Sequence, residues 1–165
     1  MKPFSDNVVF LDTEFSTLDP YQGEILSIGI VKLNGEKLYL ELEYDGPISD
    51  WVKENILPTL QGPKVDRDSA KATIKEFIGT GKPYMVSYVN QFDAVYFYKL
   101  FGTENQPCFW LPIDFASIVF GAGKDPEKLL DVAKKMGVDS KKYKLHNALN
   151  DAELLKEIYL KFFDK

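Results

Sequence analysis

The stretch that decides the fold is Val8-Val9-Phe10-Leu11-Asp12-Thr13-Glu14-Phe15, VVFLDTEF. Its run of four apolar residues, two of them β-branched, predicts a strand that is buried on both faces. The strand ends in two acids, Asp12 and Glu14, and residues two apart on a strand project from the same face. Two convergent carboxylates repel, and each raises the pKa of the other unless a cation lies between them. We therefore expect a site for a hard divalent cation at the end of this strand; the alternative is an acidic pair exposed to solvent.

The residues that follow predict a three-stranded antiparallel start. Two further strands are expected over residues 25–33 and 36–44, joined by a two-residue hairpin turn at Asn34-Gly35. Helices and strands then alternate, which predicts an α/β fold: a central mixed five-stranded sheet flanked by helices, with the first strand at its centre. The remaining expected strands are 84–89 and 108–115, and the expected helices are 51–57, capped by Ser49 or Asp50, 69–79, capped by Asp68, 91–101, 126–136 and 147–163.

Composition narrows the class of protein. The chain has 165 residues, of which 45% are apolar, enough for one packed core. Cys108 is the single cysteine, so no internal disulfide can form, and no segment reaches the roughly 18 apolar residues of a membrane span. We therefore expect a cytoplasmic protein. The net charge of −5 argues against a protein that holds long duplexes, but it permits a deep site that takes only the end of one strand.

Two later stretches carry groups that are expected to join Asp12 and Glu14. Asp93 lies at the start of a predicted helix, just after a strand that is a candidate neighbour of the first strand. Asp151 lies in the first turns of the last helix, and His146, the only histidine, precedes it by five residues. In a continuous helix these two would lie about 140° apart around the axis. We therefore expect His146 in the loop before the helix, free to swing over the site.

These residues resemble the signature of the DEDDh exonucleases, the 3'-to-5' nucleases of the ribonuclease H-like superfamily. Asp12 and Glu14 match the first motif and Asp93 matches the second. His146 and Asp151 match the third, whose His-x4-Asp spacing marks the histidine subclass. The resemblance covers all 165 residues as a single exonuclease domain and implies the ribonuclease H-like fold.

Within that superfamily the chain is most similar to the small bacterial exoribonucleases of the RNase AS type. The similarity lies in FLDTEF at 10–15, EILSIGIV at 24–31, ISDWVKENILPTL at 48–60 and HNALNDA at 146–152. It implies an enzyme that acts on single-stranded RNA 3' ends, with a preference for adenylate tails. It also implies a homodimer without a membrane partner.

The resemblance further implies a mechanism with two Mg²⁺ ions, or Mn²⁺ in their place. Two ions about 4 Å apart would clamp the attacking and leaving oxygens of the terminal phosphodiester. Asp12 would bridge the ions, with Glu14 and Asp151 completing the first metal site. Asp93 would hold the second ion, directly or through water. His146 would accept the proton of the attacking water, and a nucleoside 5'-monophosphate would be released.

Contacts to the substrate are expected directly after the acid pair, where the family's Thr-Thr-Gly is replaced by Phe15-Ser16-Thr17. We predict that Phe15, Ser16 and Tyr88 bind substrate, with the two aromatic rings stacking on the terminal base, an interaction of about 1 to 3 kcal/mol. Packing in the core is the alternative for both rings. A cluster upstream of the histidine would contact backbone phosphates or form an ordinary solvated loop, and both interpretations stay open. This cluster comprises Lys141, Lys142 and Lys144.

Three other functions compete with an exoribonuclease. A phosphatase of the haloacid dehalogenase type needs an aspartate two residues after its nucleophilic aspartate, and Glu14 occupies that position. A non-catalytic RNA-binding module on the same fold would normally have lost metal ligands, whereas all five positions are present here. A 3'-5' exonuclease acting on single-stranded DNA keeps the same five residues, so only the RNase AS-like segments favour RNA.

Overall fold

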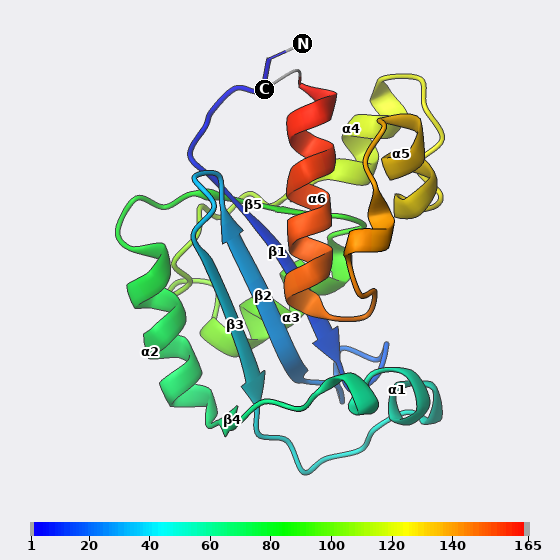
Figure 1. Ribbon diagram of the computed structural model, residues 1–165. Helices are drawn as coiled ribbons and strands as arrows, with labels where there is room; N and C mark the ends of the chain where they lie inside the picture. Colours follow the sequence, from blue (N-terminus) through cyan, green and yellow to red (C-terminus); the bar gives the residue numbers. More distant parts are fainter. Residues whose placement is uncertain (1, 164–165) are drawn as a thin grey trace.

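A mixed sheet with helices on both faces forms the fold, which a computed structural model describes for residues 2–163 (Figure 1). Six strands lie in the order β4-β3-β2-β1-β5-β6. They are β1 Val8–Phe15, β2 Ile25–Lys32, β3 Lys37–Leu42, β4 Lys64–Val65, β5 Tyr84–Ser87 and β6 Ile113–Asp114. The α-helices are α1 Asp50–Asn55, α2 Arg67–Ile78, α3 Gln91–Phe101, α4 Phe115–Gly121, α5 Leu129–Lys135 and α6 Ala148–Phe162, and the 3-10 helices are η1 Leu57–Thr59 and η2 Ser140–Lys142.

β1 lies at the centre of the sheet, as predicted. It pairs antiparallel with β2 over residues 9–15, but its parallel pairing with β5 covers residues 8–10 only. Beyond Phe10, one side of β1 therefore has no strand neighbour while the other side stays paired. This free side leaves backbone N–H groups near the end of the strand available to side chains from elsewhere in the fold.

The turn between β2 and β3 is longer than the predicted two-residue turn. The N–H of Lys32 donates to the carbonyl of Glu36 at 2.8 Å, and the N–H of Gly35 donates to the carbonyl of Lys32 at 3.0 Å. The loop therefore contains three residues, 33–35. Gly35 has a φ of +97°, which glycine adopts without a steric cost. The Asn-Gly pair thus marked the hairpin correctly, but as part of a three-residue loop.

The sheet has one strand more than the five predicted. β4 is only two residues long, and alternation cannot be recognised over so short a segment. The strand predicted over residues 108–115 shrinks to β6, since residues 108–112 form no strand and Asp114 ends it. The Asp114 carboxylate accepts hydrogen bonds from the N–H groups of Ala116 and Ser117, and it thereby begins α4, a helix that was not predicted.

The starts of α1 and α2 test two predicted caps. Ser49 caps α1, and its hydroxyl accepts a hydrogen bond from the N–H of Val52, as expected for one of the two candidates. Asp66, not Asp68, caps α2, because Asp66 has an extended backbone and accepts from the N–H groups of Asp68 and Ser69. Asp68 instead lies in the first turn, where a carboxylate favours the positive end of the helix dipole.

The side chains of β1 alternate between two apolar cores, one on each face of the sheet. Val9 and Leu11 pack with residues of α2 and α3, and Val8 and Phe10 pack with residues of α4, α5 and α6. Figure 1 places α6 across one face of the sheet and α3 behind it. None of the helices within residues 2–163 is long and apolar enough to cross a membrane.

Candidate active site

The side chains of Asp12 and Glu14 lie on the face of β1 that α6 covers, near the end of the strand. Alternation puts both carboxylates on the same face as Phe10, which packs against α6. Their neighbours on β2 are Gly29, which has no side chain, and Ser27, which has a small one. The two half-buried acids therefore stand over the middle of the sheet beside the start of α6.

Asp151 reaches the same point because α6 packs directly on the backbone of β2. A Cβ added to Gly29 would lie 2.3 Å from the carbonyl oxygen of Ala148, so only glycine permits this approach. The Asn147 side chain caps the helix by accepting from the N–H of Asn150. As a result, oxygens of the three carboxylates all lie within 4.8 Å of one another. These carboxylates are Asp12, Glu14 and Asp151.

Asp93 approaches from α3, on the other side of β1. It is 5% exposed, and its Oδ1 accepts hydrogen bonds from the N–H of Thr13 at 2.9 Å and from the Thr13 hydroxyl at 2.7 Å. The N–H of Thr13 is available because β5 no longer pairs with β1 at this position. Asp93 is therefore placed beside the trio without being one of its three close members.

Burial raises the pKa values of all four acids, and the charges of neighbouring acids add to this effect at Asp12 and Glu14. Burial, followed by the charges of Asp93, Glu14 and Asp151, raises the pKa of Asp12 well above its usual range. Burial and then the charges of Asp151 and Asp93 raise the pKa of Glu14 to about 8. Burial also raises the pKa of Asp93 to about 7, despite its hydrogen bonds from Thr13, and that of Asp151 to about 6. The cluster therefore cannot hold all its negative charge at neutral pH without a counter-ion.

The donor set fits a hard divalent cation such as Mg²⁺ or Mn²⁺. Carboxylate oxygens are the protein ligands that these ions prefer, and three of them converge here. Within residues 2–163 no second group of three acidic, histidine or cysteine side chains comes as close together. The repulsion among the buried acids is what a bound cation would relieve.

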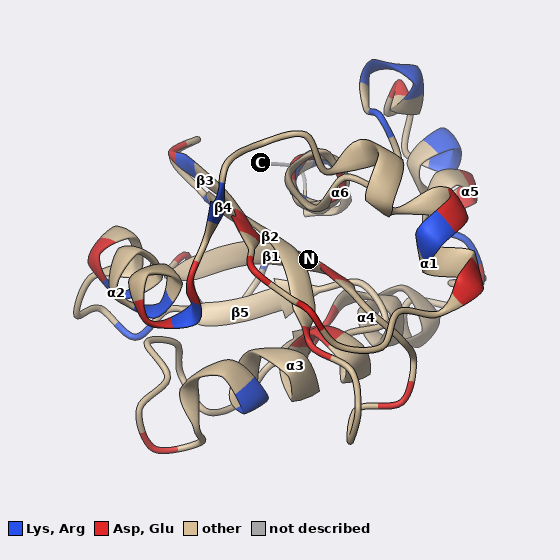
Figure 2. Cartoon of the chain, turned by 90° about the horizontal axis from the view of Figure 1, so that it is seen from below, with Lys and Arg blue, Asp and Glu red and all other residues tan. Residues whose placement is uncertain are grey.

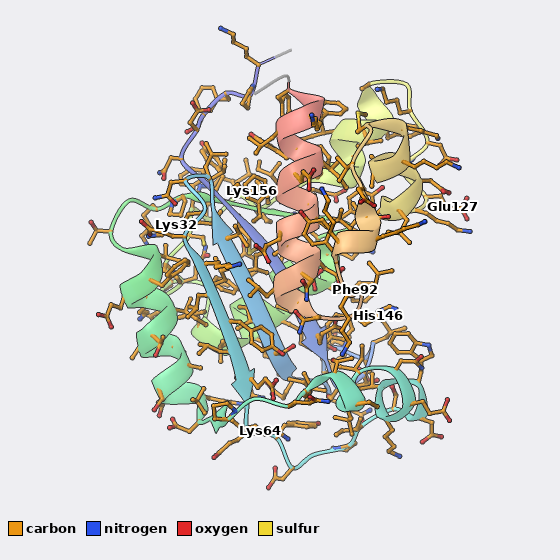
Figure 3. All side chains as sticks on the ribbon, viewed as in Figure 1. Lys32, Lys64, Phe92, Glu127, His146 and Lys156 are labelled. Carbon is orange, nitrogen blue, oxygen red and sulfur yellow. The ribbon has the colours of Figure 1, made fainter. Side chains whose placement is uncertain are left out.

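His146 lies in the loop before α6, as predicted, but its backbone is held in place. The N–H of His146 donates to Asp151 Oδ2 at 2.9 Å. The hydroxyl of Thr59 lies 3.0 Å from the His146 carbonyl oxygen and 2.8 Å from that of Ile56, and its single proton is shared between them. The residue has a φ of +58°, an uncommon conformation for a residue other than glycine. Its exposed ring contacts Trp51 edge to face, with centroids 5.4 Å apart, and Figure 3 places it below the first turn of α6. Only the side chain is thus free to turn over the acids.

These groups line a cleft of about 510 Å³. Part of the lining comes from the loop after β1 and from α1, and its exposed large apolar groups are Leu18 and Trp51, which are 66% and 54% exposed. The stretch around Trp51 resembles the RNase AS family, but no role at the site was expected for it. The available signal was a tryptophan next to a helix cap, outside the apolar periodicity that predicts a core residue. The full lining is Asp12, Thr13, Glu14, Phe15, Thr17, Leu18, Ser49, Trp51, Val52, Ile56, His146 and Asp151.

The three predicted substrate contacts fall in different places, beginning with Phe15 and Ser16. Phe15 lines the cleft but is half-buried, and its ring stacks on Tyr96 at 4.6 Å between centroids. Ser16 is fully buried, and its hydroxyl accepts a hydrogen bond from the N–H of Glu24 at 3.1 Å. Its backbone carbonyl accepts from the N–H of Ser49. This arrangement gives Ser16 a role in joining the two walls and argues against a direct contact with substrate.

Tyr88 lies outside the cleft lining. Its ring packs with the apolar core between the sheet and α6, and its hydroxyl donates to the carbonyl of Pro126. Burial raises the pKa of this hydroxyl to about 12, so it stays protonated. These contacts favour the core-packing alternative over base stacking for Tyr88.

Comparison with known proteins identifies the family. The family model described as exonuclease (RNase T) matches residues 9–159, and a search of curated protein sequences found no match. Among solved structures, Pop2p of S. pombe in its Mg²⁺ and Mn²⁺ bound form superposes with a TM-score of 0.70 at 16% identity, over 96% of this chain and 84% of that chain.

Two bacterial exonuclease I structures are similar over a shorter part of their length. The zinc-bound complex of E. coli exonuclease I with single-stranded DNA has a TM-score of 0.72 at 16% identity, and it covers 94% of this chain and 40% of that chain. Exonuclease I from Methylocaldum szegediense has a TM-score of 0.72 at 14% identity, with 96% and 40% coverage. The chain therefore spans about 40% of the length of the exonuclease I chains. These likenesses establish the ribonuclease H-like exonuclease fold, and with the family match over most of its length the chain belongs to the exonuclease family.

Proposed function

We propose that this protein is a metal-dependent 3'-5' exoribonuclease of the DEDDh type, which releases nucleoside 5'-monophosphates from single-stranded RNA. The observation that carries the proposal is the convergence of the Asp12, Glu14 and Asp151 carboxylates within 4.8 Å at a cleft that His146 also lines. If the acids instead formed a purely structural ion-pair network, lysine or arginine side chains would have to pair with them. The cluster contains no lysine or arginine within hydrogen-bonding range among residues 2–163.

The acids would hold two Mg²⁺ ions, with Mn²⁺ as a substitute. Asp12, Glu14 and Asp151 would bind the first ion, and Asp93 would contribute to the second directly or through water. Bound divalent ions supply charge neutralisation at the phosphate and a more acidic attacking water. Asp93 has Oδ2 available for this role, because both Thr13 hydrogen bonds go to Oδ1.

His146 would act as the general base. A neutral imidazole accepts the proton of the attacking water, and geometry decides whether it can reach that water. The loop positions it, since the backbone of His146 is fixed at its N–H by Asp151 and at its carbonyl by Thr59. The side chain extends from this fixed point at the rim of the cleft toward solvent, where a substrate enters.

The apolar wall would receive the terminal base. Trp51 and Leu18 are exposed and line the cleft, and base stacking on an aromatic ring is worth about 1 to 3 kcal/mol. Phe15 would contact the nucleotide from the floor of the cleft, with its ring fixed by Tyr96. In this arrangement the terminal phosphodiester would lie over the carboxylates, and the terminal base would lie against Trp51 and Leu18.

The finer assignment rests on sequence resemblance. The RNase AS-like segments favour RNA over DNA, an adenylate preference and a homodimer, and the single buried Cys108 is consistent with action in the cytoplasm. Pop2p with Mg²⁺ and Mn²⁺ and exonuclease I with single-stranded DNA have the same fold, which supports a metal-dependent enzyme acting on a single strand. An exonuclease that acts on single-stranded DNA is the second candidate, because the exonuclease I complex contains this substrate.

A gel time course tests the proposal. Poly(A), mixed-sequence RNA and single-stranded DNA, each labelled at the 5' end, are incubated with Mg²⁺ or with EDTA. The control variants are Asp12→Ala, which removes a central carboxylate, and Asp45→Ala, which removes an acid outside the cleft lining. A Mg²⁺-dependent ladder that shortens from the 3' end, is fastest on poly(A) and disappears only in Asp12→Ala supports the proposal. Faster loss of DNA would move the assignment to the second candidate, and binding without cleavage would leave a non-catalytic module.

A further inference from the structure

One segment of the chain has a charge opposite to that of the whole. Residues 124–144 contain seven lysines and four acidic residues, which gives this segment a local charge of +3 in a chain whose net charge is −5. The segment forms α5 and η2 and then leads into the loop of His146. In Figure 2 its blue ribbon lies beside α5, on the same side of α6 as α1. A cationic region therefore adjoins the cleft.

The ammonium groups of the last three lysines of this segment have no ion-pair or hydrogen-bond partner among the described residues. Five lysines elsewhere among the described residues pair with acids, for example Lys32 with Glu36 at 2.7 Å and Lys37 with Glu153 at 3.0 Å, and others are solvated. By contrast, the ammonium groups of three exposed lysines make no ion pair or hydrogen bond to any residue between 2 and 163. We call these three the lysine surface; they are Lys141, Lys142 and Lys144.

The lysine surface is held on a fixed backbone. Tyr143 lies between its members, packs with the core next to α6 and donates its hydroxyl hydrogen to Glu157 Oε2 at 2.6 Å. The Asp139 side chain accepts a hydrogen bond from the N–H of Lys141 at 3.2 Å, which fixes the start of η2. A flexible solvated loop would lack such an anchor. The three ammonium groups thus occupy a defined region of the surface.

Charge distinguishes the two segments that lie next to His146. Lys144 lies two residues before His146, so the lysine surface continues directly from one rim. α1 also lies next to His146 through Trp51, but its exposed acids are Asp50 and Glu54, and Asp50 is paired with Lys53. The upstream phosphates of a bound strand are repelled by these acids and attracted by the unpaired lysines. The strand therefore gains binding free energy by passing over the lysine surface.

We propose that the lysine surface binds the phosphodiester backbone of a single strand upstream of its 3'-terminal nucleotide, an inference that rests on the proposed function. The lysines would contact two or three phosphates and read no base, because ammonium groups on phosphates position a strand without selecting its sequence. They would therefore act on long substrates and have no effect on a dinucleotide, which ends inside the cleft.

The test compares two triple variants that remove equal charge. K141Q/K142Q/K144Q neutralises the lysine surface, and K64Q/K71Q/K75Q neutralises three lysines on β4 and α2, across the sheet from α6. Steady-state kinetics are measured on a diadenylate and on a 15-nucleotide oligoadenylate. Affinity for the 5'-fluorescein-labelled 15-mer is measured by anisotropy on an Asp12→Asn background, so that the strand stays uncut. Thermal unfolding confirms that each variant is folded.

For K141Q/K142Q/K144Q we expect affinity for the 15-mer to fall by about 10- to 100-fold at 0.1 M salt, because two or three phosphate contacts are lost. The slope of log affinity against log salt concentration should also become shallower by about 0.7 for each lost contact. KM for the 15-mer rises correspondingly, while kcat and all constants for the diadenylate stay at the wild-type values. Equal effects of the two triple variants, or a wild-type salt slope in K141Q/K142Q/K144Q, would refute the inference. Failure of the wild type to cleave either substrate would instead refute the proposed function, and the anisotropy comparison would still decide the role of the lysines.

Discussion

Replacing Glu14 by glutamine should stabilise the metal-free protein at neutral pH while abolishing activity. Burial and the neighbouring acids raise the pKa of Glu14 from 4.5 to about 8, whereas an unfolded chain restores the ordinary value. The folded protein therefore binds more protons than the unfolded one between these pH values. Its free energy of unfolding falls as pH rises through this range, by about 1.4 kcal/mol per pH unit.

The magnitude follows from this interval. Between pH 4.5 and pH 7 the loss for a single glutamate is at most about 3 kcal/mol, because the neighbouring acids share the charge. Glutamine has nearly the same shape and no charge, so Glu14→Gln escapes the loss. At pH 7 in EDTA we expect the variant to be more stable than the wild type by up to about 3 kcal/mol, or about 6 to 12 °C in Tm. Near pH 4.5 the two proteins should unfold almost together.

Urea unfolding at half-unit steps from pH 4.5 to pH 8 measures the effect, first in EDTA and then in Mg²⁺. Saturating Mg²⁺ should raise the stability of the wild type more than that of the variant, because the cation relieves the repulsion that glutamine has already removed. The matched control is Glu127→Gln, since Glu127 is exposed near α5 and points away from the cleft (Figure 3). It should differ from the wild type by no more than about 0.5 kcal/mol at any pH. Parallel pH profiles of the wild type and Glu14→Gln in EDTA would refute the electrostatic account of the site.

Three other substitutions test how the fold supports the site. Gly29→Ala should cost about 1 to 3 kcal/mol of stability and lower activity, because the new Cβ, 2.3 Å from the Ala148 carbonyl oxygen, must push α6 away; wild-type values in urea unfolding and initial-rate assays would contradict this. Thr59→Val should lower kcat about 10-fold and leave KM nearly unchanged, because the carbonyl of His146 loses its hydroxyl partner; a change confined to KM in steady-state assays would argue against positioning. Trp51→Ala should raise KM for single-stranded RNA about 5- to 100-fold through lost base stacking, and an unchanged KM would place the base elsewhere.

Local chemistry is what made the main elements predictable. The apolar run of β1 had to be a buried strand, and alternation along it fixed Asp12 and Glu14 on one face before any neighbour was known. The spacing of His146 and Asp151 likewise favoured a loop position for His146, and the structure begins α6 after it. These predictions succeeded because each depends on residues a few positions apart.

The short elements were not predicted, because they depend on contacts between residues that are distant in the sequence or on single side-chain hydrogen bonds. β4 consists of two residues that pair in parallel with the end of β3, and a pattern of two residues is too short to predict such a pairing. α4 begins inside an apolar run because the Asp114 side chain turns to cap it, a choice made by hydrogen bonds rather than by hydrophobic periodicity. The predicted cap Asp68 differs from the observed Asp66 because both precede the same apolar stripe.

The sequence by itself determined which side chains carry the chemistry, whereas only the tertiary structure decided how they meet. Asp93 was expected beside the other acids, but its position is set by the N–H of Thr13, which is free only because β5 stops pairing with β1. The separation of Asp151 from Asp12 depends on the missing side chain of Gly29, and the cleft wall at Trp51 depends on a segment that the chain brings back from 40 residues away. Periodicity reports the face on which a residue lies. Distances across the fold depend on packing between segments remote in sequence, and they are settled only when the whole core has formed.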